Sequence, residues 1–133
     1  MRCRWGDFQY SLGGEVDKAG HPVFRDGPYR YSKPDFLVHM PGDMDGNLSV
    51  VEVKSSTASL SAIRADVKKL AWYCGAPARY YGAVLLMFGG PSQADDWWPD
   101  LLASIAEAGV EHFVLVRHSN VHQAARVAGT VGI

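Results

Sequence analysis

The stretch YSKPDFLVHMPGDMDGNLSVVEVK, residues 31–54, decides the fold of the chain around it. Its segments FLVHM and LSVVEVK are apolar, whereas PGDMDGN between them consists mostly of residues that favour turns. The stretch therefore predicts a β-hairpin. Because side chains alternate between the two faces of a strand, Glu52 and Lys54 share one face, while Val51 and Val53 share the other. We expect the valine face to point inward.

The pairing of the two strands decides which charges meet. If His39 pairs with Leu48, Asp35 lies opposite Glu52 and Lys54 follows on the same strand. Two carboxylates roughly 4–5 Å apart repel each other by about 3–4 kcal/mol at an effective dielectric near 20. A shared proton would offset this repulsion, and so would a divalent cation such as Mg²⁺, which binds carboxylates, waters and phosphates. A lysine beside such an ion can hold a water and stabilise charge on a phosphate, so this pattern is typical of phosphodiester cleavage.

These residues resemble the PD-(D/E)xK, or restriction-endonuclease-like, nuclease superfamily. Pro34 and Asp35 match its "PD", and Glu52, Val53 and Lys54 match its "ExK". The resemblance implies that Asp35 and Glu52 bind Mg²⁺, for which Mn²⁺ can substitute, together with the main-chain carbonyl of Val53. It also implies that Lys54 positions the attacking water. The catalytic residues implied by the resemblance are therefore Asp35, Glu52 and Lys54.

The resemblance covers about residues 30–90. Within this range the layout of the chain is similar to that of uncharacterised bacterial members of the superfamily, at the positions His39, Asn47, Asp66, Lys69 and Leu70. The resemblance implies that a helix lies beside the ExK strand and that Lys68 or Lys69 approaches a substrate phosphate. Independently of the resemblance, the charge of Arg30, just before the hairpin, makes it a further candidate for a phosphate contact, the alternative being a solvated edge. A Glu-x-Lys triplet alone arises by chance in about one chain of this length in three. The triplet therefore indicates a nuclease-like site only in combination with the hairpin before it and the helix after it. The alternative is a solvated edge strand whose charges have no such role.

The chain after the hairpin alternates between helical and strand patterns. Apolar residues at helical spacing predict a helix over residues 60–74, capped by Ser59 or Ser61 and ended by Gly75. YYGAVLLMF, from Tyr80, reads as a central strand buried on both faces. A second helix is expected over residues 94–108, a strand at VEHFVLVRH, and a short helix around VHQAARVAG. Residues 1–30 are expected to be irregular, without the long first helix usual in the superfamily.

Composition limits the remaining choices. With 133 residues and 47% hydrophobic content, one domain over residues 1–133 is expected. The formal net charge of −1 predicts weak rather than tight binding of nucleic acid, or help from a partner or a second subunit, so a homodimer stays open. Two cysteines without a paired motif favour a reduced, cytoplasmic protein, and the longest apolar run, AVLLMF, is too short to cross a membrane.

Together these patterns predict an α/β fold with a restriction-endonuclease-like core, in which a mixed β-sheet, antiparallel at the hairpin and parallel at the crossovers, is flanked by helices. The first functional hypothesis is an Mg²⁺-dependent endonuclease that hydrolyses DNA, with RNA left open as the substrate. The alternative is an inactive module of nuclease fold that binds nucleic acid or protein. A third hypothesis is a domain that assembles through its Trp-rich segment 97–102.

Overall fold

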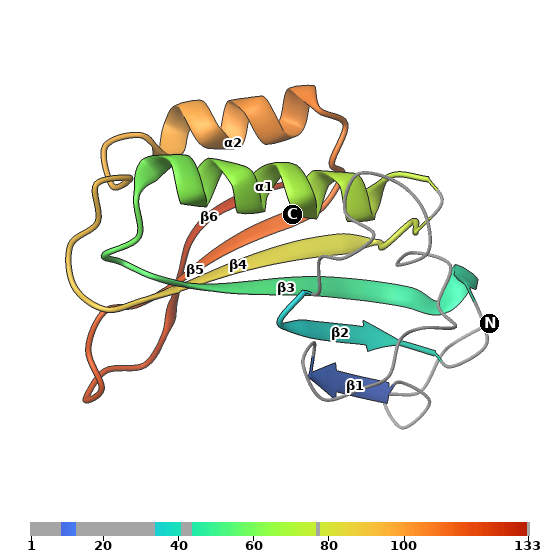
Figure 1. Ribbon diagram of the computed structural model, residues 1–133, viewed down its shortest axis with the longest axis horizontal. Helices are drawn as coiled ribbons and strands as arrows, with labels where there is room; N and C mark the ends of the chain where they lie inside the picture. Colours follow the sequence, from blue (N-terminus) through green and yellow to red (C-terminus); the bar gives the residue numbers. More distant parts are fainter. Residues whose placement is uncertain (1–8, 13–33, 41–43, 77, 133) are drawn as a thin grey trace.

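The computed structural model describes residues 9–12, 34–40, 44–76 and 78–132 (Figure 1). In chain order these residues form β1 (Gln9–Leu12), β2 (Phe36–His39), the 3-10 turn η3 (Met44–Gly46), β3 (Asn47–Ser55), α1 (Leu60–Cys74), β4 (Gly82–Phe88), α2 (Trp98–Glu107), β5 (Phe113–His118) and β6 (Arg126–Val131). Their six strands make one sheet in the order β1-β2-β3-β4-β5-β6. The β3–β4 and β4–β5 pairs are parallel and the other pairs are antiparallel, so the predicted α/β fold with a mixed sheet is confirmed.

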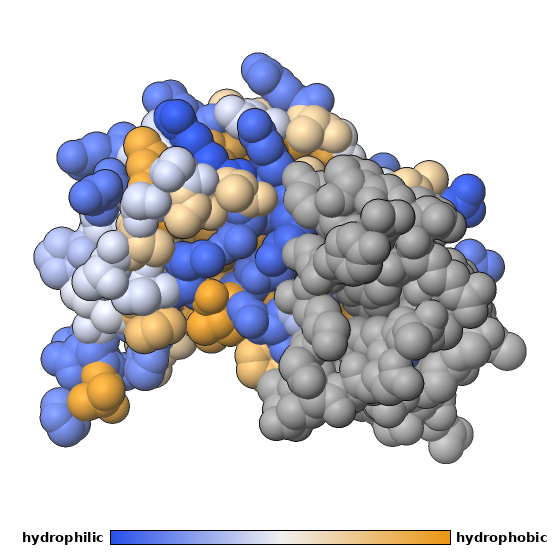
Figure 2. Space-filling model, in the orientation of Figure 1, coloured by the Kyte–Doolittle hydropathy of each residue, from blue (hydrophilic) through white to orange (hydrophobic). Residues whose placement is uncertain are grey.

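Both helices lie on the same side of the sheet (Figure 1). Each connects two neighbouring parallel strands, and two successive crossovers of the usual right hand place their helices on one face. The core fills the space between this layer and the sheet; its largest side chains include Leu37, Ile63, Leu70, Tyr73, Leu85, Met87, Leu101, Ile105, Phe113 and Leu115. The outer side of the helix layer is largely hydrophilic, as expected of amphipathic helices (Figure 2).

The first helix has the bounds that the sequence predicts. Ser59 is its N-cap, and its Oγ accepts a hydrogen bond from the backbone N–H of Ala62 at 3.2 Å. Gly75 is its C-cap, where the backbone N–H donates to the carbonyls of Ala71 and Trp72. The cap fixes where the helix starts, and this sets which side chains of α1 lie over β3.

The second helix begins at Trp98 rather than at Ala94, so its predicted start is wrong. The residues between form turns instead, because Asp95 Oδ2 accepts the backbone N–H of Ser92 at 2.8 Å and Trp97 N–H donates to the carbonyl of Ala94 at 2.9 Å. Pro99 then occupies the first helical turn, where its missing N–H is tolerated.

The hairpin register is confirmed over most of its length. Phe36 pairs with Val51, and the pairing continues in step to Val38, so that Asp35 precedes the strand at the position facing Glu52. A bulge after Val38 then shifts His39 onto Asn47 instead of Leu48, and that single predicted pair is wrong. The bulge lies on the turn side of the hairpin, so it leaves the pairing near Asp35 unchanged.

The expectation that the valine face of β3 points inward is wrong. Glu52, with 4% of its surface exposed, lies on the face that the helices cover, whereas Val51 and Val53 are half-buried on the opposite face. The charges can face the helix layer because α1 supplies charged partners for them. β4 also alternates: Leu85 and Met87 are fully buried on the helix side and their neighbours Val84 and Leu86 are half-buried, so the expected burial on both faces is not found.

The expected helix around VHQAARVAG is also wrong, since residues 126–129 of this segment belong to strand β6 (Arg126–Val131). β6 pairs antiparallel with β5, so pairing with an open sheet edge overrides the helical tendency of the two alanines. In residues 1–30 the structure describes only β1, which pairs antiparallel with β2. Among the described residues, no helix has the length and apolar character needed to cross a membrane.

Candidate functional site

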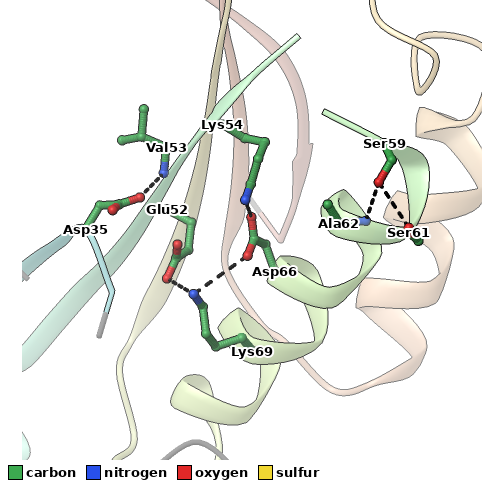
Figure 3. Close-up of polar contacts among 9 residues, drawn as sticks. All are labelled: Asp35, Glu52, Val53, Lys54, Ser59, Ser61, Ala62, Asp66 and Lys69. Carbon is green, nitrogen blue, oxygen red and sulfur yellow. Dashed lines mark hydrogen bonds and ion pairs between the residues drawn. The ribbon is translucent and has the colours of Figure 1, made fainter. Parts of the chain in front are cut away.

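The candidate site lies between the second half of β3 and the middle of α1 (Figure 3). Alternation along β3 directs Glu52 and Lys54 toward α1, and the spacing of Asp66 and Lys69, one helical turn apart, directs both of them back toward the strand. The site is therefore built by two elements that follow each other in the chain.

Four charged side chains form an alternating network there. Lys69 Nζ lies 2.6 Å from Glu52 Oε1 and 3.7 Å from Asp66 Oδ1, and Lys54 Nζ lies 2.7 Å from Asp66 Oδ2 (Figure 3). The side chain of Glu52 is 5% exposed and that of Lys69 is 13% exposed. Two carboxylates and two ammonium groups cancel in formal charge, and this makes their joint burial tolerable.

Asp35 joins the site from the side of β3 on which β2 lies. Its Oδ2 accepts a hydrogen bond from the backbone N–H of Val53 at 2.7 Å (Figure 3). Because the N–H and C=O of one strand residue project to the same side, the carbonyl of Val53 also faces the Asp35 side of the strand. Asp35 and the Val53 carbonyl, predicted as metal ligands, are thus placed on one side of β3.

The pKa of Glu52 is raised from its ordinary value of 4.5 to about 7. Burial is the largest cause; the contact with Lys69 opposes it, and the negative charges of Asp66 and Asp35 add to it. Near neutral pH such a carboxyl is present in comparable amounts in its protonated and ionised forms, so the approach of another cation would favour the ionised form.

The oxygen atoms fit a hard divalent ion. Within the described part of the chain, Asp35 Oδ1 and Glu52 Oε2 make no hydrogen bond or ion pair, so each carboxylate keeps an oxygen for a ligand. No group of three or more His, Cys, Asp or Glu side chains in the described residues is arranged to hold a metal ion. An ion here would therefore use the two carboxylates, the Val53 carbonyl, waters and substrate oxygens, a ligand set that suits Mg²⁺.

The predicted phosphate contacts have different positions. Lys69 lies inside the charge network, Lys68 is exposed on the outer face of α1, and Arg30 falls outside the described residues. The three-residue spacing of Asp66 and Lys69 allows their ion pair on a helix, but the contact of Asp66 with Lys54 is not evident from spacing. The only signal for that contact was the resemblance that placed the helix beside the strand.

In comparisons of the chain with models of known protein families, with curated proteins and with solved structures, nothing matched. The case for this site therefore depends on its geometry and on the residues themselves.

Proposed function

We propose that the protein is a metal-dependent phosphodiesterase with a restriction-endonuclease-like core that cleaves nucleic acid, DNA in the first instance. The observation that carries the proposal is the placing of Glu52, a buried carboxyl whose pKa is about 7, beside Asp35, which is anchored to the Val53 N–H. Lys54, the next residue on the same face of β3, completes a metal-and-lysine arrangement suited to hydrolysis of a phosphodiester.

Each residue has a distinct part in this proposal. Asp35, Glu52 and the Val53 carbonyl would hold Mg²⁺, which when bound supplies a Lewis acid for the phosphoryl oxygen. Lys54 would donate a hydrogen bond to the attacking water. Its ammonium group has three donors and forms an ion pair with Asp66 at 2.7 Å, so donors remain for a water. Asp66 would thus be a positioning residue that holds the ammonium group of Lys54 between β3 and α1.

The test begins with the metal because metal binding needs no knowledge of the substrate. Mn²⁺ is titrated into the wild type and into Glu52→Gln and followed by electron paramagnetic resonance, with Glu107→Gln as the matched control. Glu107 is exposed at the end of α2, so its variant makes the same chemical change away from the site. We expect saturable binding in the wild type and in the control, and its loss in Glu52→Gln.

Cleavage is then measured with Mg²⁺ on single-stranded DNA, duplex DNA and RNA. We expect Lys54→Ala to lower the rate by about 10²–10³-fold, the range seen when one transition-state donor is removed, while Mn²⁺ binding is retained. A folded wild type that binds no Mn²⁺ at millimolar concentration, or cleavage that survives in Glu52→Gln, would contradict the proposal.

One observation favours a second function, a nucleic-acid-binding module of the same fold without turnover. Glu52 and Asp66 already have cations, Lys69 and Lys54, so the network is neutral without any metal. On this hypothesis an oligonucleotide binds equally well with and without Mg²⁺, and Glu52→Gln leaves its affinity unchanged. The metal dependence of binding separates the two functions.

A further inference from the structure

A cleft separate from the candidate site lies at the carboxyl ends of β4 and β5. It has a volume of about 790 Å³, and its lining includes Gly90, Asp95, Trp98, Asn120, Arg117 and Arg126. These residues come from the loop that follows β4, the start of α2, the end of β5 and the segment that leads into β6. Among the described residues of the lining, Asp95 is the only carboxylate, against two arginines, so these residues together carry a positive formal charge.

Arg117 is the feature of this cleft that calls for a ligand. It is 5% exposed, and its Nη2 donates to the carbonyl of Gly90 at 2.8 Å and lies 3.5 Å from Asp95 Oδ1. Its Nη1 is buried and has no hydrogen-bond partner in the described part of the chain. Because buried N–H groups nearly always have a partner, a guanidinium that lines a cleft with one nitrogen unmatched is suited to an anion.

The start of α2 adds further donors beside this arginine. Trp97, its N-cap residue, makes no side-chain capping hydrogen bond, and Pro99 has no N–H. Trp98 and Asp100 are therefore the residues of the first turn whose backbone N–H groups remain directed out of the helix. Trp98 and Pro99 of this turn line the cleft together with Arg117. A helix N-terminus and a buried arginine together favour an oxyanion.

We propose that this cleft binds a phosphate group. The positive charge of two arginines and a helix N-terminus exceeds the single negative charge of Asp95. The paired N–H donors of a guanidinium group match the oxygens of a phosphate. The phosphate could belong to a nucleic-acid strand or to a free phosphate monoester, since both present the same oxygens. The inference does not depend on cleavage at Glu52.

The register of the β-sheet favours a nucleic-acid strand as the source of the phosphate. Lys54 and Arg117 both pair with Met87, one from each neighbouring strand, so they lie in one row across the carboxyl end of the sheet. Two strand spacings separate them, roughly 10 Å, and this corresponds to about three nucleotides at a rise of 3.4 Å each. A nucleic-acid strand bound along this row at Lys54 would then place one of its next phosphates at Arg117.

The test uses proton–nitrogen NMR spectra of the full chain, with EDTA present to exclude metal. The probes are inorganic phosphate, adenosine monophosphate, a five-nucleotide single-stranded DNA and acetate. The Nε–H signal of Arg117, identified by its loss in Arg117→Gln, and the indole N–H of Trp98 report on the cleft. We expect all three phosphate probes to shift both signals saturably and acetate to shift them far less. If the DNA binds most tightly, the phosphate belongs to a nucleic-acid strand. If inorganic phosphate and adenosine monophosphate bind as tightly as the DNA, the ligand is a free phosphate.

Three variants make the test specific. Removal of a charged hydrogen-bond donor in Arg117→Gln should weaken phosphate binding by about tenfold or more. Arg126, which lines the cleft but is exposed, should cause about a two- to fivefold loss when changed to Gln, and this variant does not disturb the core. Arg79→Gln, before the opposite end of β4, makes the same charge change and should stay within about twofold.

Two outcomes overturn the inference. The first is an unchanged phosphate affinity in both a folded Arg117→Gln and Arg126→Gln. The second is an equal response to acetate and to phosphate. A wild type that binds phosphate here but cleaves nothing contradicts only the proposed nuclease, whereas cleavage with no response at Arg117 contradicts only this cleft.

Discussion

Lys69 Nζ lies 2.6 Å from Glu52 Oε1, and this contact joins the middle of α1 to the strand that carries the candidate site. Both side chains are largely buried, so the pair cannot exchange its partner for water at little cost. The same contact decides how much of the negative charge of Glu52 remains for a metal ion. It therefore links the stability of the fold to the proposed activity.

Removal of Lys69 should be destabilising. In Lys69→Met the buried Glu52 loses its cation and takes up a proton, because its pKa is already about 7 with Lys69 present, so we expect a cost of about 1–3 kcal/mol from the lost contact. Lys68→Met is the matched control: Lys68 is exposed on the same helix, and its variant should stay within about 0.5 kcal/mol of the wild type. Urea denaturation at pH 7 gives both free energies of unfolding. Equal losses in the two variants would show that the Lys69 contact has no special weight.

Glu52 should make the stability of the protein depend on pH. Its pKa is about 7 in the folded chain against an ordinary 4.5, so between these values the folded state binds more protons than the unfolded state. The free energy of unfolding must therefore fall as pH rises through this window, by about 3 kcal/mol at 1.36 kcal/mol per pKa unit. Below pH 4.5 this contribution is fully present.

The difference between the wild type and Glu52→Gln isolates this effect from the titration of the histidines. We expect that difference in unfolding free energy to shift by about 3 kcal/mol against the wild type between pH 5 and pH 8. Chemical denaturation at each pH supplies the values. A difference that stays constant across the window would mean that Glu52 is ionised throughout it.

A divalent ion should offset part of this loss of stability. At pH 8, Mg²⁺ at ten times its dissociation constant should raise the free energy of unfolding of the wild type by about 1.4 kcal/mol. Glu52→Gln should gain far less because it lacks one of the two carboxylates. Thermal denaturation with and without Mg²⁺ measures both, and Ca²⁺ at equal concentration tests whether the site prefers the smaller ion. Equal gains in the wild type and the variant would place the ion elsewhere.

The local features of this fold follow from the sequence, whereas several contacts between elements do not. The bounds of α1 follow from its apolar spacing and the cap at Ser59, and the pairing of Phe36 with Val51 follows from the length of the turn. The bulge at His39 depends on the turn geometry, which residue types leave open. Asp66 could be paired with Lys69 by spacing, but its contact with Lys54 requires the rotation of α1 over the sheet.

Arg117 was missed although the sequence held a signal for it. Alternation along VEHFVLVRH places Arg117 on the same face as Phe113 and Leu115, both of which are fully buried. A charge on a buried face calls for a partner, and its partners come from the loop after β4 and from Asp95. Such a site can be read from residue spacing only once the order of the strands is known.

Two adjacent glycines in the loop after β4 should respond in opposite ways to substitution by alanine. Gly89 has φ +99°, a conformation that L side chains rarely adopt, and an added Cβ would lie 2.6 Å from Ser56 Oγ. Gly89→Ala should therefore destabilise the protein by about 1–3 kcal/mol. Gly90 has open space around it, so Gly90→Ala should be neutral or stabilise the protein by up to about 1 kcal/mol. Urea denaturation of the two variants measures the contrast, and similar values for both would show that Ser56 yields to a side chain at Gly89 without cost.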